Sequence, residues 1–492
     1  MSLTGASRED LLSDLSQMGS MGSAEREKSE TFKHTYLPVP EHVRAFDPSV
    51  ALVLGVRGAG KSELFRAAVQ EHLLPAILRT TKEARNLRIS EQVEWLKGHP
   101  LEKDFPDAVE MRRYFQSQAN KAEAERDLWF ACLVRTVRDH LSGSPIDGAE
   151  MLQLPGAEIG RVVEAFRSLE AKPLLALDDL DRKLEAEDRW LLVSYDELDV
   201  IGGYDWNSMI ASIRGLIGFW ANYSRRWTRI RPKIFLRTDL FRRHGQSFGA
   251  DLIKLAANRA EINWSDRNLY TMLVKRIANA SDRLADYCRQ SRVRFDEDRD
   301  LGLIPRLQKD TDAKPLIEKI AGQFMGANLK KGRTFPWLLT HVRDGNGHAI
   351  PRALVRLIEE AASQERDRPL ATYNRLLDPR SIRRALDVVS KEYVLQVNTH
   401  ELPWLPGVQR RLKEHGVPME RRQIESLLSK DWDQPWSSEK PEVRPPAESA
   451  SQLTDLLLEI GVLGSRPNNR IDVPDLFLAG LGLTRKGGVR KA

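Results

Sequence analysis

The sequence predicts an α/β fold: a P-loop NTPase core with a parallel sheet, a helical lid and a small C-terminal winged-helix-like domain. Three short apolar runs of strand length, at residues 50–55, 190–195 and 234–236, are the first observation. Segments with helical spacing separate these runs, as around Leu128–Val137. A Gly-rich turn follows the first run directly. Strands that alternate with helices pair in parallel and are covered on both faces, so we expect this architecture.

Length and composition limit the class of protein. The chain has 492 residues, which leaves room for about two to four domains at roughly 150 residues each. A net charge of +6 over this length places any nucleic-acid contact on a local face. The two cysteines, Cys132 and Cys288, are too few for a disulfide framework, and no apolar run approaches the length of a membrane span. We therefore expect a cytoplasmic protein without a membrane partner.

Changes in composition along the chain predict its domain organisation. The N-terminal segment is rich in Ser, Gly, Met and Glu, which indicates a flexible tail or a short frayed helix. A Pro- and charge-rich stretch near the C-terminus is typical of a linker. The expected parts are a tail at 1–35, a core at 36–262 with a helical insertion at about 85–172, a helical lid or second domain at 263–431, a linker at 432–450 and a C-terminal module at 451–492.

The Gly-rich turn carries the most specific motif of the sequence. It reads G-V-R-G-A-G-K-S from Gly55 to Ser62 and fits the P-loop pattern G-x-x-x-x-G-K-[ST]. Glycines let backbone N–H groups surround phosphates, and the following helix points its positive end at them. In this pattern Lys61 reaches the β- and γ-phosphates, and the Ser62 hydroxyl binds Mg²⁺. The expected nucleotide-binding residues are Gly55, Val56, Arg57, Gly58, Ala59, Gly60, Lys61, Ser62 and Leu64.

A P-loop site also needs a carboxylate at a strand end, and two segments compete for this role. The run 190–195 favours a strand and ends in Asp196 and Glu197. The other segment contains Asp178 and Asp179, but its initial proline and its leucine spacing favour a helix. We assign Asp196 to the Mg²⁺ shell and Glu197 to polarising the attacking water. Asp178 and Asp179 stay open as the alternative, since short apolar runs are ambiguous.

The third apolar run ends in polar residues that predict a nucleotide sensor. Lys233–Asp239 reads as a strand with a polar tip, where Arg237 or Thr238 would face the γ-phosphate. The alternative is that Arg237 pairs with a nearby acid such as Asp239 or Asp196. The preceding segment, Ser224–Lys233, has five basic residues and no acid. It suits an arginine finger or a phosphate contact, or else a solvated basic loop.

These motifs together resemble a bacterial ATPase of the AAA+/STAND division. The resemblance rests on the P-loop, the Asp196–Glu197 strand end, the Phe235-Leu236-Arg237 strand and a later Pro351-Arg352. It implies ATP and Mg²⁺ as cofactors. It also implies that Arg352 is a sensor-2-like residue, which lies at the start of a lid helix and touches the nucleotide. No duplicated-arginine box is present in the sequence, so the source of an arginine finger stays open. The run Asp178–Arg182 also resembles the acidic motif of KAP-type ATPases.

The C-terminal block resembles the winged-helix modules that end many such ATPases. A leucine stripe from Leu453 to Ile460 predicts a helix that ends at Gly461. Residues 462–474 then read as strand, tight turn and strand, and a short helix from Asp475 follows. The last eight residues carry four positive charges and no acid. This module would contact a DNA backbone or dock on a protein.

The sequence therefore predicts an ATP-hydrolysing P-loop ATPase whose nucleotide state drives a conformational change or assembly on a DNA or protein partner. The alternative is a STAND-like switch with slow turnover that recruits a separate effector protein. The expected partners are ATP, further copies of the chain or an effector, and DNA. The resemblance also suggests phage defence as the biological setting.

Overall fold

The structure is a computed structural model that describes residues 5–19, 28–83, 87, 92–98, 105–118, 121–198, 206–244, 255–366, 375–400, 402–438 and 442–486. Its contacts divide the chain into two compact units. We call Pro38–Asn263 the core unit, and we call Met1–Leu37 together with Trp264–Ala492 the helical unit. None of the described helices has both the length and the apolar character needed to cross a bilayer.

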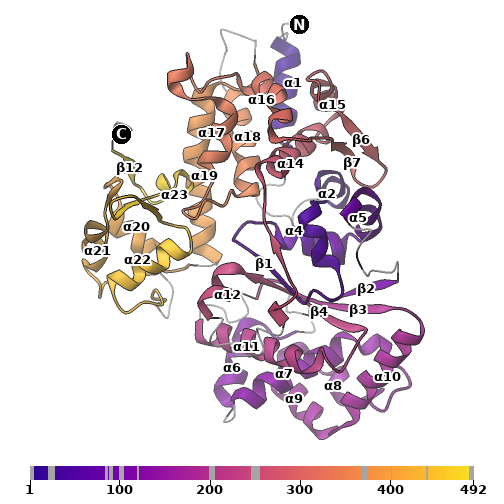
Figure 1. Cartoon of the computed structure of the whole chain (residues 1–492). Helices are drawn as coiled ribbons and strands as arrows, with labels where there is room; N and C mark the ends of the chain where they lie inside the picture. Colours follow the sequence, from indigo (N-terminus) through magenta and orange to yellow (C-terminus); the bar gives the residue numbers. More distant parts are fainter. Residues whose placement is uncertain are drawn as a thin grey trace. The chain divides into compact units, whose positions relative to one another are not determined.

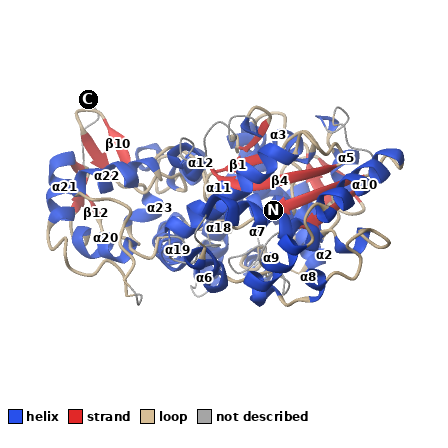
Figure 2. Cartoon of the chain, turned by 90° about the horizontal axis from the view of Figure 1, so that it is seen from below, coloured by secondary structure: helices blue, strands red, loops and turns tan. Residues whose placement is uncertain are grey.

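A five-stranded sheet forms the centre of the core unit (Figures 1 and 2). The strands lie in the order β2-β3-β4-β1-β5, and every neighbouring pair is parallel. The sequence prediction of a parallel α/β sheet is confirmed. Its strands are β1 (Leu52–Gly55), β2 (Val93–Lys97), β3 (Trp190–Tyr195), β4 (Ile230–Arg237) and β5 (Arg259–Ile262).

The register of the sheet aligns the ends of β1 and β4, and β3 ends three residues earlier along β4. Leu52 of β1 and Tyr195 of β3 are both level with Ile234 of the intervening β4. Gly55, the last residue of β1, is level with Arg237, the last residue of β4. Because the strands are parallel, the segments that follow β1, β3 and β4 all leave from the same edge of the sheet. We call this the carboxyl edge.

Helices cover both faces of the sheet, and Figure 1 shows α4 and α5 on one side and α6 to α11 on the other. The second group encloses an apolar core that includes Trp129, Tyr195, Trp220 and Trp227. These helices of the core unit are α3 (Pro40–Val43), α4 (Lys61–Phe65), a π-helical turn (Arg66–Gln70), α5 (Leu74–Thr80), α6 (Ala108–Ser117), α7 (Lys121–Thr136), α8 (Glu150–Gln153), α9 (Ile159–Ser168), α10 (Lys172–Ala186), α11 (Trp206–Tyr223) and α12 (Thr238–His244).

The sequence analysis did not identify the two edge strands. β2 lies inside the stretch expected as a helical insertion, and only the central residue of its five, Trp95, is buried. β5 has four residues, of which Arg259 and Glu261 are exposed. Edge strands are paired on one side only and need no continuous apolar run, so their sequences give little signal.

The N-terminal segment differs from the expected flexible tail in its described part. It contains α1 (Gly5–Leu15) and α2 (Ser29–Thr35). Leu12 and Leu15 of α1 are fully buried, and Arg8 forms a buried ion pair with Glu365 at 3.0 Å. The leucine spacing gives the helix one apolar face, and that face packs against α18. Because the segment is rich in polar residues, the sequence analysis did not identify this apolar face.

The helical unit continues through a bundle of helices and a small hairpin, β6 with β7. Its next elements are α14 (Asp266–Ala278), α15 (Asp282–Arg289), β6 (Phe295–Asp298), β7 (Gly302–Pro305), α16 (Lys314–Ala321), α17 (Thr334–His341), α18 (Pro351–Arg366) and α19 (Pro379–His400). The most extensive contacts of this region join α18 to α19.

In its described residues, the C-terminal part of the helical unit has four helices, a three-stranded sheet of order β10-β11-β9 and a strand pair, β12 with β8. The hairpin predicted between residues 462 and 474 is present, with Asn468 and Asn469 at positive φ in its turn. Its elements are α20 (Leu405–Leu412), β8 (Gly416–Val417), β9 (Met419–Glu420), α21 (Arg421–Ser429), α22 (Ala450–Glu459), β10 (Gly464–Arg466), β11 (Arg470–Asp472), α23 (Asp475–Leu478) and β12 (Thr484–Arg485).

The segment expected as a linker packs against this part of the unit. Trp436 is fully buried, and its carbonyl accepts a hydrogen bond from Gly407 N at 3.0 Å. The Arg411 guanidinium lies 3.7 Å from the centre of the Trp436 ring. The described residues of 432–450 are therefore held by α20. The division of residues 263–492 into lid, linker and module stays a prediction.

Candidate functional site

The Gly-rich loop between β1 and α4 has the backbone that its motif requires. Gly58 and Gly60 have φ angles of 68° and 94°, which side-chain-bearing residues adopt only at a cost. The helix begins at Lys61 directly after Gly60. The loop therefore turns sharply at two glycines and presents the N-terminus of a helix, an arrangement that favours anions.

Lys61 lies back inside this loop. Its ammonium Nζ is 3.3 Å from the carbonyl oxygen of Gly55 and 3.4 Å from that of Val56. Its charge is thus held beside the two carbonyls at the start of the loop. The side chain of Leu64 is buried and its N–H donates to Gly60 O at 2.9 Å, so neither group of Leu64 faces the loop.

Arg237, at the end of β4, forms a two-bonded ion pair with Asp239. Arg237 Nε is 3.0 Å from Asp239 Oδ1, and Nη2 is 2.6 Å from Oδ2. Burial alone would raise the pKa of Asp239, but the charges of Arg237, Arg57 and Lys61 outweigh it and lower that pKa below 3.8. One carboxylate therefore stands among three cations. The structure contains the Arg237–Asp239 ion pair, which was the alternative to a sensor role.

Asp196 and Glu197 directly follow β3 and lie at the carboxyl edge. Asp196 is buried, with 9% of its surface exposed. Glu197 has a φ of 54°, an unusual conformation for a residue with a side chain. Such strain occurs often at functional sites, where the surroundings hold it. The sheet thus brings the acidic pair, the P-loop and Arg237 to one edge, with β4 between the two strands concerned.

The donor set at this edge fits Mg²⁺. This cation prefers hard oxygen ligands and usually keeps several waters, with one or two carboxylates and the phosphates of a substrate. Ser62 in the first turn of α4 and Asp196 after β3 supply a hydroxyl and a carboxylate. The described residues contain no cluster of three or more His, Cys, Asp or Glu that would bind a metal alone. A metal here would therefore depend on a bound phosphate.

The alternative acids lie on α10 and contact the opposite edge of the sheet. Asp178 accepts hydrogen bonds from Arg226 Nε at 2.7 Å and from Trp227 Nε1 at 3.0 Å. Asp179 is exposed and pairs with Arg182. These partners precede Ile230, where β4 begins, so they lie about 23 Å along the strand from its carboxyl end. This placement favours Asp196 over Asp178.

Asp181, one helical turn beyond Asp178, has a structural role that the sequence analysis missed. Its carboxylate accepts three backbone hydrogen bonds, from Thr228 N at 2.8 Å, Arg229 N at 2.7 Å and Ile230 N at 2.9 Å. It thereby holds the start of β4. The repeated acids at 178–181 were the visible signal, but their function as anchors depends on a segment some 48 residues away.

Most cations of the basic segment Ser224–Lys233 have partners within the core unit. Arg226 pairs with Asp178, and Arg229 pairs with Asp188 at 2.8 Å and lies over Trp190. Arg231 donates to the carbonyl of Trp227 at 3.1 Å. Lys233 is fully buried and donates to Val50 O at 2.6 Å. Only Arg225 is exposed without a described partner. The segment is therefore largely bound within the core unit rather than solvated, and its expected contact with a phosphate or role as an arginine finger stays a prediction.

Arg352 lies in the helical unit, in the first turn of α18. It is exposed, and none of the described residues forms a hydrogen bond or ion pair with its guanidinium. Its expected contact with nucleotide stays a prediction. Of the basic C-terminal tail, the structure describes Arg485 and Lys486, and residues 487–492 lie outside the described part.

Comparisons with known proteins add little to this geometry. No protein-family model matches the chain, and no curated protein matches it. Among solved structures, the chain is similar to the Aeropyrum pernix ORC2 protein, whose structure was determined in ADPNP–ADP complexes. The sequence identity is 14%, the match covers 88% of this chain and 85% of that one, and the TM-score is 0.35. Because the sequence identity and the TM-score are this low, the interpretation of the site rests on its own residues.

Proposed function

We propose that the protein binds ATP with Mg²⁺ at the carboxyl edge of the core sheet and hydrolyses it. One observation carries this proposal. Two segments leave the same edge of one parallel sheet: the Gly-rich loop that contains Lys61, and the acidic pair Asp196–Glu197. In open α/β sheets, ligands bind outside the carboxyl ends of the strands. The combination of a phosphate-binding loop with a nearby strand-end acid is what phosphoryl transfer requires.

The roles of the residues follow from their chemistry. The loop amides and Lys61 would hold the phosphates, and Ser62 with Asp196 would hold the metal, which neutralises phosphate charge when bound. Glu197 would orient the attacking water. Arg237, kept in place by Asp239, would respond to the γ-phosphate by exchanging one anionic partner for another. Catalysis would thus come from positioning and charge stabilisation.

ATP turnover by the purified chain tests this assignment. Lys61→Ala should abolish nucleotide binding, whereas Glu197→Gln should lower the turnover about 100-fold or more and keep binding, because it removes only the group that orients water. Asp178→Asn is the matched control, an acid at the opposite edge that should leave the turnover per folded molecule unchanged. Loss of turnover in Asp178→Asn with full activity in Glu197→Gln would contradict the proposal.

We further propose that the C-terminal part is a winged-helix-like module that begins before residue 451. Three helices and the sheet follow one another as α20, β9, α21, α22, β10 and β11, and the hairpin β10–β11 would be the wing. On this interpretation the segment 432–450 joins two helices of the module. Its packing against α20 through Trp436 supports this boundary.

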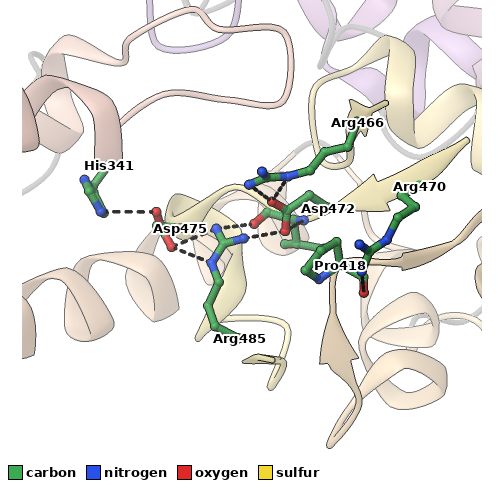
Figure 3. A network of polar contacts seen from close by, with 8 residues as sticks. His341, Pro418, Arg466, Arg470, Asp472, Asp475 and Arg485 are labelled. Carbon is green, nitrogen blue, oxygen red and sulfur yellow. Dashed lines mark hydrogen bonds and ion pairs between the residues drawn. The ribbon is translucent and has the colours of Figure 1, made fainter. Parts of the chain in front are cut away.

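Charge on this module favours a protein partner over DNA. The exposed face of α22, the helix before the hairpin, has no basic residue; it presents Glu459 and Asp455, which pairs with Arg421 at 2.7 Å. The two arginines of the hairpin are held by the module itself, as Figure 3 shows for Arg466 with Asp472 and for Arg470 with the Pro418 carbonyl at 3.0 Å. A helix face without cations and a hairpin with bound arginines suit a protein surface better than phosphates.

This observation supports the second candidate function, a STAND-like switch that recruits a protein. Turnover that is slow and unaffected by DNA, together with a nucleotide-dependent change in particle size, would favour the switch. A size unchanged by ATP would speak against coupling of the nucleotide to assembly, whether with further copies of the chain or with an effector. The setting in phage defence stays a hypothesis from the sequence resemblance.

A further inference from the structure

The loop between α16 and α17 is a closed hairpin with an exposed tip. We call residues 323–334 the α16–α17 hairpin. Phe324 and Arg333 face each other in an antiparallel bridge, and Met325 N donates to Gly332 O at 2.9 Å. A short 3-10 turn, Leu329–Lys331, forms the tip. The loop thus has defined geometry of its own.

The base of this hairpin is fixed to the helical unit. The side chain of Met325 is fully buried, and its carbonyl accepts a hydrogen bond from the Arg383 guanidinium on α19. On the other side, Phe335 in the first turn of α17 stacks on Tyr270, with ring centres 4.2 Å apart. The tip is therefore held in a constant place relative to α17 and α19.

The hairpin presents positive charge that is not neutralised. Lys330, Lys331 and Arg333 are all exposed, and within the described chain no carboxylate forms an ion pair with them. Residues 319–343 contain no Asp or Glu at all. Arg383, also exposed, adds a fourth cation at the base.

Acids at the end of α16 and at the start of α19 have other partners. Glu318 pairs with Lys314 at 3.7 Å, and Asp378 pairs with Arg375 at 2.8 Å. They do not offset the charge of the tip. The α16–α17 hairpin is therefore a cationic surface of the helical unit, in contrast to Arg466 and Arg470 of the C-terminal hairpin.

We infer that this hairpin contacts the phosphate backbone of duplex DNA. Lys and Arg side chains on backbone phosphates supply most of the affinity in such contacts. Leu329 at the tip is 58% exposed and flanked by these cations, which matches proteins that place an apolar side chain in the minor groove beside basic residues. This inference goes beyond the proposed ATPase function and needs no bound nucleotide.

Two other partners fit the hairpin less well. Protein–protein interfaces are depleted in lysine at their centres, whereas this tip has two adjacent lysines. Membrane binding needs either a large apolar face or several lipid anchors, and the tip offers one leucine. An acidic protein and an anionic membrane are therefore outcomes that the experiment must separate from DNA.

The test measures binding of the full-length chain to a fluorescent DNA duplex, without nucleotide, over a series of salt concentrations. The variant Lys330→Gln/Lys331→Gln/Arg333→Gln should weaken binding at least about tenfold near 100 mM salt and should lower the slope of log K against log salt by about 2 to 3. The matched control is Lys172→Gln/Lys183→Gln, two exposed lysines on α10 in the core unit, which should bind as the wild type does.

Separate outcomes would overturn the inference. It fails if the wild-type chain does not bind the duplex at low salt, or if the triple variant binds as tightly as the control. It also fails if the triple variant keeps DNA binding but loses binding to vesicles that contain anionic lipid. Equal melting temperatures of the variant and the wild type would show that the fold is intact. ATP turnover, measured in parallel, separates this result from failure of the proposed ATPase function.

Discussion

Two basic segments of this protein look alike in sequence and differ completely in the structure. Ser224–Lys233 has five cations in ten residues, and the stretch Lys330–Arg333 has three in four. Four cations of the first segment are bound to carboxylates, carbonyls or a tryptophan face of the core unit. The three cations of the second are exposed and unpaired among the described residues. Charge density in a sequence therefore does not reveal which charges a partner can reach.

The physical reason lies in what surrounds each segment. The first leads into β4, a central strand, so most of its side chains lie against the core unit, where an unpaired polar group would be costly. The second is the tip of a surface hairpin, where water solvates the cations fully. The following predictions test this contrast, beginning with the largest expected effect.

Replacing the buried lysine should be far more costly than replacing an exposed one. Lys233→Ala should lower the free energy of unfolding by about 4 kcal/mol, because it creates a buried cavity, removes the donor of the Val50 carbonyl and leaves the Asp47 carbonyl with Val50 N alone. Lys330→Ala should change the same quantity by less than about 0.5 kcal/mol. Denaturant unfolding of the two variants measures both. Similar losses of unfolding free energy in the two variants would contradict the contrast between the two basic segments.

A buried histidine of the core unit should make stability depend on pH. Burial lowers the pKa of His42 to about 4 from its ordinary value of 6.5, although its Nε2 hydrogen bond to the Asn263 carbonyl at 2.9 Å and the nearby Glu41 act against this. The unfolded chain therefore takes up a proton first as the pH falls. Stability should be fully present above pH 6.5 and should fall by about 3 kcal/mol by pH 4.

The variant His42→Gln isolates this contribution, since glutamine cannot titrate in that range. The melting temperature of the wild type should fall more steeply than that of His42→Gln between pH 6.5 and 4. Parallel curves would mean that His42 does not drive the pH dependence.

The backbone hydrogen bonds that Asp181 accepts at the start of β4 should contribute more to stability than the ion pairs nearby. Asp181→Ala removes the acceptor for three backbone N–H groups, and we expect a loss of about 2 kcal/mol in unfolding free energy. Asp188→Asn is a suitable control, because it removes the charge of an exposed carboxylate that pairs with Arg229 and keeps a residue type that tolerates the positive φ of 50° at this position. If the control is as destabilising as Asp181→Ala, the three backbone bonds are not what holds the strand.

The smallest effect concerns the half-exposed pair of Asp178 with Arg226. Water screens this pair, so Asp178→Asn should cost less than about 1 kcal/mol of stability. The pair also holds the pKa of Asp178 below 3.8, so this contribution is present above that range and is lost as the pH falls through it. Thermal unfolding at pH 7 and pH 3 compares the two states. A stability difference that is the same at both pH values would exclude the ion pair as its source.

Local sequence patterns predicted the parts of the site that depend on local geometry. The P-loop was identified because its glycines and helix start are properties of eight consecutive residues, and β3 has the predicted bounds because its apolar run ends abruptly at Asp196. Gly461, predicted to end a helix, has a φ of 75° after α22. The edge strands β2 and β5 escaped prediction because a strand at the edge of a sheet can be short and polar.

By itself, the sequence predicted the fold class, the Gly-rich loop with its P-loop motif and the two candidate pairs of acids. Only the tertiary structure decided that Asp178 and Asp181 contact the start of β4 while Asp196 stands at its far end. Likewise, only it separated the neutralised cations at 224–233 from the exposed ones of the α16–α17 hairpin. The physical reason is the distance along the chain over which each property is determined. Neighbouring residues determine the backbone conformation, whereas packing between elements far apart in the sequence determines which partner a charged side chain finds.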